Sequence, residues 1–211
     1  MVTMLEKRSP DFPGLNLCSE TLEGLKKHHD IAHSLEAQVA DLADQIAYHH
    51  HDLDDGLRSG ILTTDDLLKH VPLWEKVTED LSESKLDQEL FWKIGVTRLM
   101  SLLIDDLLFQ TKKNLQEKKT VVEFSQKMQQ NVEMLAEFLG KTFYLSEKVS
   151  QFAKQGQKVI RFLFHYYSDH EERLPLAVQK GLEHEKPAIV IKDYIAGMTD
   201  EYAVTKYEEY K

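Results

Sequence analysis

Apolar residues recur along most of the chain at the three- and four-residue spacing of helices that bury one face. Residues 35–56 carry the clearest stripe, and Ser34 just before it is suited to an N-cap. The apolar members of this stripe are Leu35, Val39, Leu42, Ile46 and Leu53. The pattern therefore predicts a long helix that begins at about residue 34.

Two further long helices are predicted, at 84–118 and at 145–170. The middle of the first, RLMSLLIDDLLF, is apolar nearly all round, as in a helix buried at the centre of a domain. The predicted buried face of the second consists of Leu145, Val149, Phe152, Ile160, Leu163 and Tyr167.

Proline, glycine and capping residues divide the rest of the chain into shorter elements. Residues 1–18 form an extended lead-in, followed by a short helix at 19–29. We expect Gly56 and Gly60 to break the first long helix, and Thr63 or Thr64 to cap a short helix that ends before Pro72. Pro175 and Pro187 should bracket a short element. A helical pair should then run from 188 to about 209. With only 9 Gly and 5 Pro, the sequence predicts an all-α fold in one domain, residues 1–211.

The polar face of the 35–56 helix is unusual for a solvent-exposed surface. Its ionisable residues follow the same rhythm as the apolar stripe, roughly 200° around the axis. They are Asp41, Asp44, Tyr48, His51 and Asp55. No Lys or Arg occurs in this stretch before Arg58. Because acidic groups without basic partners repel each other, the face predicts a site for a cation or a positively charged ligand.

The composition restricts the partners of the chain. Its 26 basic and 36 acidic residues leave a formal charge of −10, which disfavours broad nucleic-acid or anionic-membrane binding. Cys18 is the only cysteine, so an internal disulfide is excluded and a reducing compartment is favoured. The most apolar run, 99–109, is far shorter than the roughly 20 residues that span a bilayer. There is no signal-peptide pattern, and we expect a cytoplasmic location.

Three segments of the chain resemble one known family. ADQIAYHHHDLDDG at 43–56 is similar to the second metal-binding segment of the deoxynucleoside triphosphate triphosphohydrolases, the dGTPase-like branch of the HD phosphohydrolases. RSPDFPGLNLCSETLEGLKKH at 8–28 and DYIAGMTDEYA at 193–203 resemble other stretches of that branch, in the same order. The resemblance implies an HD-phosphohydrolase-like C-terminal helical domain. The family's upstream His and His-Asp pair are absent from this sequence, so we expect it to be the C-terminal portion of such an enzyme.

The resemblance assigns roles to residues of the polar face. It implies that Asp44 is a ligand of the catalytic divalent metal and that Tyr48 and Asp52 lie beside the nucleotide sugar. By spacing alone, Asp44 also fits a solvated surface residue. Three consecutive histidines cannot converge on one ion, because neighbouring side chains of a helix point about 100° apart. We expect His51 to orient a ligand rather than bind the metal, and His49 and His50 to be partly exposed.

Arg98 is the candidate for binding the triphosphate. Its planar guanidinium suits phosphate oxygens, and the family supplies an Arg from a helix at about this distance downstream. The alternative is an interface Arg with its stem packed and its head in water. Asp105 and Asp106 lie in the most apolar stretch, where we expect each to pair with a Lys, an Arg or a helix terminus.

The implied reaction is hydrolysis of a deoxynucleoside triphosphate to a deoxynucleoside and tripolyphosphate, with Mg²⁺ or Mn²⁺ held by His, His-Asp and the distal Asp. Since only the distal Asp is present, we expect weak metal binding and no activity from the chain alone. No catalytic residue is assigned. The expected partners are further copies in a homo-oligomer, or a separate N-terminal chain that carries the missing ligands. The alternative function is a non-catalytic helical interaction module that keeps the family fold.

Overall fold

The structure, a computed structural model, describes residues 2–6, 8–26, 34–81 and 85–211. Within these ranges every regular element is helical, and none is a strand. The all-α prediction is confirmed. No helix among the described residues is long and apolar enough to cross a membrane.

The chain divides into two compact units, which are described separately. One comprises Asn16–Ser146, and the other comprises Met1–Leu15 together with Glu147–Lys211. Each contains its own cluster of buried apolar side chains. The expectation of one domain over the whole chain stays a prediction.

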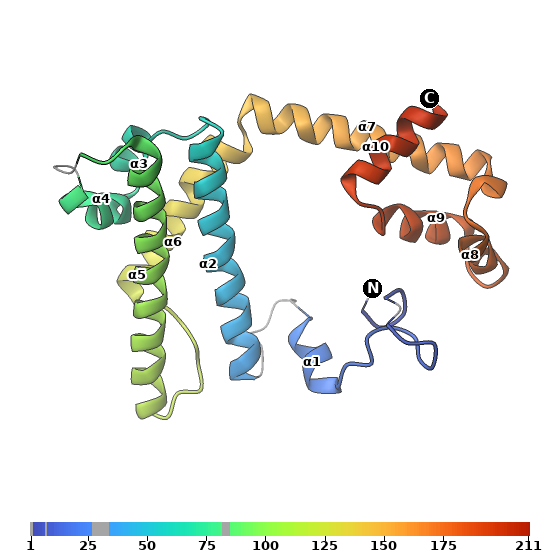
Figure 1. Cartoon of the computed structure of the whole chain (residues 1–211). Helices are drawn as coiled ribbons and strands as arrows, with labels where there is room; N and C mark the ends of the chain where they lie inside the picture. The colour runs from blue at the N-terminus through green and yellow to red at the C-terminus, as the bar shows by residue number, and fades with distance from the viewer. Residues whose placement is uncertain (1, 7, 27–33, 82–84) are drawn as a thin grey trace. The chain divides into compact units, whose positions relative to one another are not determined.

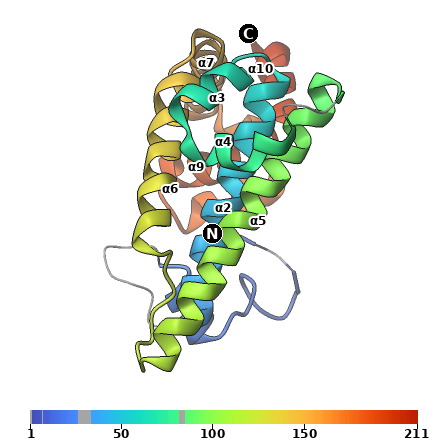
Figure 2. The same cartoon turned by 90° about the vertical axis from the view of Figure 1, so that its left-hand side faces the viewer.

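The unit Asn16–Ser146 is built around two long antiparallel helices. Figures 1 and 2 show α2 and α5 side by side, with α6 returning next to them. The elements are α1 Ser19–Gly24, α2 Leu35–Arg58, α3 Thr64–His70, α4 Pro72–Thr78, the 3₁₀ turn η1 Glu79–Leu81, α5 Gln88–Gln116, α6 Gln126–Leu139 and the π-helical turn η2 Gly140–Tyr144. Its core is mainly aliphatic, with fully buried Leu53, Leu67 and Leu135 among its members.

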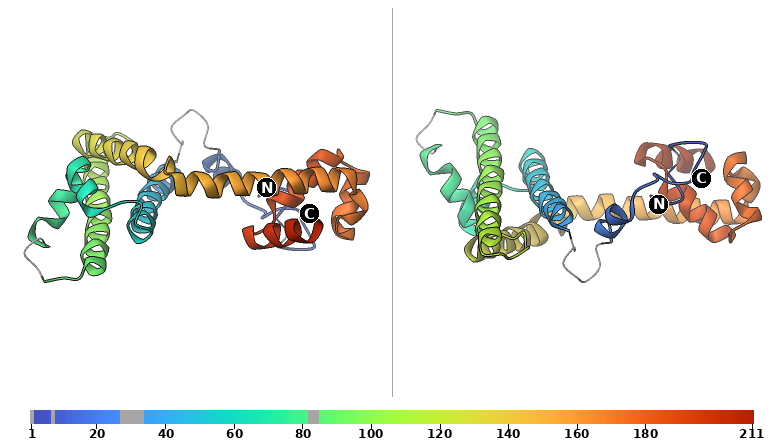
Figure 3. Two further views of the ribbon diagram at one scale, coloured as in Figure 1. Left: turned by 90° about the horizontal axis from the view of Figure 1, so that it is seen from above. Right: turned by 90° about the horizontal axis from the view of Figure 1, so that it is seen from below.

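The second unit is organised by one long helix, α7, against which α9 and α10 pack. Its helices are α7 Glu147–Asp169, η3 Glu171–Arg173, α8 Leu176–Gln179, η4 Lys180–Glu183, α9 Pro187–Ala196 and α10 Asp200–Tyr210 (Figure 3). Its buried core consists of aliphatic side chains and Tyr167, and several partly buried aromatic residues pack against it: Phe162, Tyr166, Tyr194 and Tyr210.

Helix starts were predicted well because their caps are local. The Ser34 hydroxyl accepts a hydrogen bond from the Ala37 amide at 3.1 Å, and Thr63 accepts one from Asp66 at 3.1 Å. Both caps confirm the prediction. The short helix expected at 19–29 is Ser19–Gly24, and the predicted end of that helix lies partly outside the described residues.

Gly56 behaves differently from the prediction, whereas Gly60 and Pro72 agree with it. Gly56 does not break α2, which continues to Arg58. The glycine is needed for packing instead, since an added Cβ would lie 2.4 Å from Leu62 Cδ1. Gly60, with φ +70°, follows the helix end. The short helix α3 ends before Pro72, as predicted, and Pro72 begins α4, where its missing N–H costs no intrahelical hydrogen bond.

Two predicted buried faces are only partly buried. On α5, Leu99 and Leu103 are buried, but Leu108 and Phe109 are 63% and 71% exposed. The apolar run predicted a helix that is buried on all sides, and this prediction is wrong because part of α5 is exposed. On α7, burial is limited to the stretch that α9 and α10 cover, so that Leu163 is buried and Phe152 is 68% exposed. Of the other residues predicted to be buried, Val39, Leu145 and Ile160 are exposed.

Asp106 pairs with a helix terminus, as predicted. Its carboxylate accepts hydrogen bonds from the Ser125 amide at 2.8 Å and from the Ser125 hydroxyl at 2.7 Å. Ser125 is itself the N-cap of α6. A negative charge at the start of a helix is favourable, which explains a carboxylate in this apolar region.

Candidate functional site on helix α2

The polar face of α2 presents three predicted site residues one turn apart. Asp44 and Tyr48 are exposed, and Asp52 is half-buried. The helical rise separates Asp44 from Asp52 by about 12 Å along the axis. The row is therefore long enough to contact a ligand at two separate points, as the resemblance predicts for a metal and a sugar.

Tyr144 joins this row from a distant part of the sequence. Its hydroxyl donates a hydrogen bond to Asp52 Oδ2. Its ring stacks on Tyr48, with centroids 6.0 Å apart and planes inclined by 25°. Burial, together with the hydrogen bond to the Asp52 carboxylate, raises the pKa of Tyr144 well above its ordinary value, so the phenol remains a donor. The sequence analysis did not identify this residue.

The π-helical turn η2 explains how Tyr144 reaches α2. Leu139 is fully buried at the end of α6, and the wider turn gives Tyr144 a half-buried position five residues later. Thr142 Oγ1 donates to the Phe138 carbonyl at 2.5 Å. A hydroxyl bonded to the carbonyl four residues back competes with regular α-helical pairing and bends helices, so this contact favours the irregular turn.

The three histidines differ in their surroundings. His49 is 6% exposed, contrary to the expected partial exposure. Neither of its ring nitrogens has a hydrogen-bond partner among the described residues. Burial lowers the pKa of His49, while the Asp52 charge acts in the opposite direction. His51 is exposed and makes an edge contact with His50, with centroids 5.4 Å apart. Its predicted role beside a metal ligand stays a prediction.

Arg98 makes its hydrogen bonds away from α2. Its guanidinium donates to the two carboxylate oxygens of Asp80 at 2.5 and 3.2 Å and to the Val77 carbonyl at 3.1 Å. The side chain is 41% exposed. This geometry matches the alternative of an interface arginine that ties α5 to η1, and the phosphate role remains a prediction.

The donor set for a metal is incomplete in the part of the chain that the structure describes. No group of three or more His, Cys, Asp or Glu side chains is placed there to hold an ion. Asp44 offers carboxylate oxygens of the kind that Mg²⁺ and Mn²⁺ prefer, but one carboxylate is too few to retain an exchangeable ion. A metal at Asp44 would need ligands from elsewhere.

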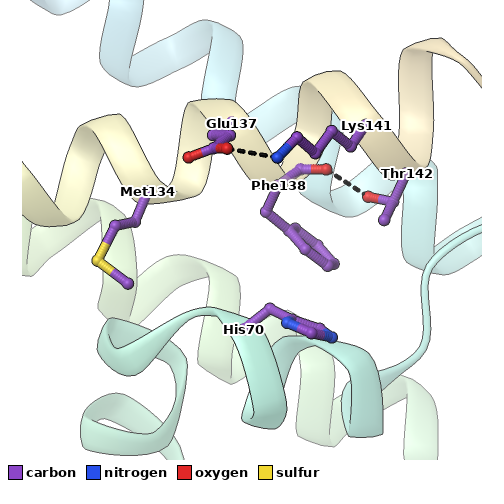
Figure 4. A pocket seen from close by; sticks show the side chains of 6 residues that line it. All are labelled: His70, Met134, Glu137, Phe138, Lys141 and Thr142. Atoms are coloured by element: carbon purple, nitrogen blue, oxygen red, sulfur yellow. Dashed lines mark hydrogen bonds and ion pairs between the residues drawn. The ribbon is translucent and has the colours of Figure 1, made fainter.

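A pocket of about 360 Å³ lies beside η2 but does not include the predicted site residues. Figure 4 shows the His70 ring facing the Phe138 ring, with centroids 5.8 Å apart. Lys141 bridges to Glu137 at its edge. The pocket is lined by His70, Met134, Glu137, Phe138, Lys141 and Thr142. The same short turn therefore supplies Tyr144 to α2 and two side chains to this pocket.

Residues 122–209 match the model of a phosphohydrolase-associated domain. The match includes Tyr144 and begins after Asp44 and Asp52. It also spans parts of both compact units.

Similar proteins named deoxyguanosinetriphosphate triphosphohydrolase-like protein occur in several bacteria. The one from Leptospira interrogans is 33% identical over 99% of this chain and 62% of its own length. The one from Geobacter sulfurreducens is 33% identical over 99% of the chain and 61% of its own length. The one from Deinococcus deserti is 36% identical over 97% of the chain and 58% of its own length. The chain thus belongs to the deoxyguanosinetriphosphate triphosphohydrolase-like family and spans about three fifths of the length of these relatives.

Proposed function

We propose that this chain supplies the helix that binds sugar and metal in a deoxynucleoside triphosphate triphosphohydrolase. The observation that carries the proposal is the α2 face, where Tyr48 and Asp52 are held by Tyr144 one and two turns beyond Asp44. The names of the similar proteins supply the substrate class. The reaction is hydrolysis of a deoxynucleoside triphosphate to a deoxynucleoside and tripolyphosphate.

The proposed roles follow the chemistry of each side chain. Asp44 would be one of the residues that hold Mg²⁺ or Mn²⁺, and a bound ion would supply polarisation of a phosphoryl oxygen and activation of water. Asp52 accepts a hydrogen bond from a sugar hydroxyl, and the exposed Tyr48 ring packs beside the sugar. His51, exposed on the same helix, orients a metal ligand or its water.

In this proposal, Arg98 exchanges the Asp80 carboxylate for the triphosphate. Its guanidinium binds the Asp80 carboxylate with two hydrogen bonds, a geometry that phosphate oxygens can also satisfy. Its partial exposure leaves the head accessible to solvent. The triphosphate would therefore compete with Asp80 for the same donors.

The incomplete donor set makes the chain inactive alone in this proposal. The complete assembly includes a polypeptide that brings His and His-Asp ligands to Asp44. Self-association of the chain would cover exposed apolar surface. The exposed Leu108 and Phe109 of α5 offer such a surface, and we propose that further copies of the chain pack there in a homo-oligomer. Light scattering of the purified chain at tens of micromolar tests this, and a strictly monomeric species contradicts it.

The second candidate function is a non-catalytic helical interaction module. The same exposed apolar residues of α5 favour it, because they suit association whether or not the α2 face binds a nucleotide. The two candidates differ in the expected behaviour of Asp44: only the enzyme needs its carboxylate.

A reconstitution assay separates the two. The chain is mixed with a polypeptide carrying the part of a similar relative that it does not match, and release of tripolyphosphate from deoxynucleotides is measured with Mg²⁺ or Mn²⁺. We expect no release by the chain alone and metal-dependent release by the mixture. Asp44→Asn should abolish both metal binding and release, whereas Glu36→Gln, a change at an exposed acid in the first turn of the same helix, should retain them.

Three outcomes count against the proposed function. Metal-dependent release by the chain alone that Asp44→Asn abolishes would mean that the remaining ligands come from within the chain. Release by the mixture that survives Asp44→Asn would remove the residue from the metal site. Absence of any release from the mixture, with intact association, would favour the interaction module.

A further inference from the structure

The contact between η2 and α2 is more specific than core packing requires. Tyr144 makes two kinds of interaction with two residues of one helix face, a hydrogen bond to Asp52 and a ring stack on Tyr48. These residues are 92 and 96 positions away in the sequence. Apolar packing of η2 needs neither a hydroxyl nor a carboxylate acceptor, so packing does not explain the choice of tyrosine.

Asp52 and Tyr48 each keep a part of the side chain that a ligand can contact while Tyr144 holds the other part. Tyr144 occupies Oδ2 of Asp52, which leaves Oδ1 able to accept from another hydroxyl. The Tyr48 ring stacks against the Tyr144 ring, with centroids 6.0 Å apart, and the residue is still 54% exposed. A carboxylate and an aromatic ring that are fixed in this way lose little further conformational freedom when a ligand binds.

The backbone that carries Tyr144 supports the same interpretation. Single π-helical turns are rare and occur frequently at functional sites, because they redirect side chains that a regular helix would place elsewhere. Here the wide turn places Tyr144, rather than Thr142, against α2: Thr142 is exposed and Tyr144 is half-buried.

We propose that Tyr144 is a positioning residue that holds the Asp52 carboxylate and the Tyr48 ring in the orientation that receives the sugar of a deoxynucleotide. This inference rests on the proposed function of α2. Tyr144 acts through its two partners, and the hydroxyl and the ring have separate effects. The hydroxyl sets the Asp52 carboxylate for a sugar hydroxyl, and the ring sets Tyr48 beside the sugar carbon that carries a second hydroxyl in ribonucleotides.

Three variants separate these effects in the reconstituted assembly. Tyr144→Phe removes the hydroxyl and keeps the ring, and Tyr144→Leu removes both. Phe143→Leu is the matched packing control, because Phe143 is half-buried in the same turn, 5.6 Å from the Tyr144 ring, and makes no hydrogen bond to Asp52. For Tyr144→Phe we expect KM for deoxynucleotides to rise about ten-fold while kcat changes less than two-fold. The reason is that the contact with the sugar weakens equally in the ground state and in the transition state.

Tyr144→Leu should additionally reduce the preference for deoxynucleotides over ribonucleotides about ten-fold, because the Tyr48 ring loses its support. Phe143→Leu should lower the melting temperature without either change. If Tyr144→Phe leaves KM unchanged, or if Phe143→Leu reproduces its KM effect, the positioning role is wrong and the contact is structural.

A stability measurement on the chain alone tests the contact without relying on hydrolysis. The free energy of unfolding is measured with denaturant in wild type, Tyr144→Phe, Asp52→Asn and the double variant. The loss in the double variant should be smaller than the sum of the two single losses, because each single change removes the same hydrogen bond.

The two measurements together distinguish the possible failures. Coupled losses of stability in a chain whose assembly shows no hydrolysis would contradict the proposed function and, with it, the sugar-positioning role. Additive losses would overturn the Tyr144–Asp52 contact even if hydrolysis is observed.

Discussion

Each compact unit has a tyrosine that is withdrawn from solvent, half-buried in one and fully buried in the other, and the two hydroxyl groups have opposite surroundings. Tyr144 of the unit Asn16–Ser146 donates to the Asp52 carboxylate. Tyr167 of α7 is fully buried, and its hydroxyl has no hydrogen-bond partner among the described residues. Its ring lies edge-on to Tyr194 and Tyr210, with centroids 5.4 and 6.0 Å away. Burial raises the pKa of both phenols, so both remain protonated at neutral pH.

This difference separates a polar contact with a specific partner from aromatic packing. In the first unit, the hydroxyl connects a distant turn to an exposed polar face. In the second, the ring supplies the contact area, and lysines lie over the outer rings: Lys206 Nζ is 5.4 Å from the Tyr210 centroid. We infer that the aromatic cluster of the second unit stabilises the fold, whereas the tyrosine of the first unit serves the site. The predictions below test that distinction.

The largest expected effect concerns whether the two units fold together. Leu135 of α6 and Leu163 of α7 are both fully buried, one in each unit. Truncation of either to Ala should lower the free energy of unfolding by about 2–5 kcal/mol, through lost burial and the cavity that remains. If the chain is one domain, both variants should shift the same single transition in calorimetry. Two transitions, each shifted by only one of the variants, would contradict the one-domain prediction.

The second prediction compares an acid of each unit in the reconstituted assembly. Asp52→Asn keeps the shape of the side chain but weakens acceptance from a hydroxyl. Hydrogen bonds to charged groups contribute roughly 1.5–3 kcal/mol, so kcat/KM should fall about ten- to a hundred-fold while metal binding remains. Asp193 of α9 is the control: it is also half-buried, lines a tyrosine-containing pocket and pairs with Lys192 at 2.6 Å. Asp193→Asn should leave kcat/KM unchanged; loss of metal binding by Asp52→Asn would mean that the roles along α2 are misassigned.

The α2 face was predictable from sequence because helical spacing places its residues without any knowledge of the rest of the fold. Asp44, Tyr48 and Asp52 lie one turn apart as expected, and the Ser34 cap fixes where the helix begins. The same local reasoning located α9 and α10 as a helical pair after Pro187, although the Thr199 cap that begins α10 was not identified. Fold class and element positions therefore follow largely from local patterns.

Contacts between distant segments were not predictable in this way. Helix α6 is rich in Gln and Glu and was missed, and with it the turn that brings Tyr144 to Asp52. The apolar run of α5 indicated burial on all sides, but its exposure depends on which elements cover it, as for Leu108 and Phe109. His49 was misjudged for the same reason: its burial is a property of the packed unit and not of the three-histidine sequence.

The third prediction returns to the two tyrosines, this time through stability. Tyr144→Phe should lower the free energy of unfolding by about 1 kcal/mol, since a hydrogen bond to a partly exposed carboxylate is lost. Tyr167→Phe keeps the edge-on ring contacts and removes a hydroxyl without a partner, so stability should stay the same or rise by a few tenths of a kcal/mol. Denaturant unfolding measures both. Equal losses for the two variants would show that the Tyr167 hydroxyl also makes a stabilising contact.

The last prediction concerns one of the buried polar side chains of the first unit that have no hydrogen-bond partner among the described residues, as the Tyr167 hydroxyl has none in the second. His49 has a pKa lowered by burial, from an ordinary value of 6.5. Below pH 6.5 the unfolded chain therefore binds a proton that the folded chain does not, and the free energy of unfolding falls as the pH falls towards the folded pKa. The slope from this one group is at most about 1.4 kcal/mol per pH unit.

His49→Leu should remove that part of the slope between pH 6.5 and 5 and, because no hydrogen bond is lost, should be as stable as wild type at pH 8. The Tyr167→Phe control should leave the acid slope unchanged, because a buried phenol does not titrate in this range. Denaturant unfolding at a series of pH values measures the slope, and an unchanged slope in His49→Leu would mean that His49 is charged or paired in the folded protein.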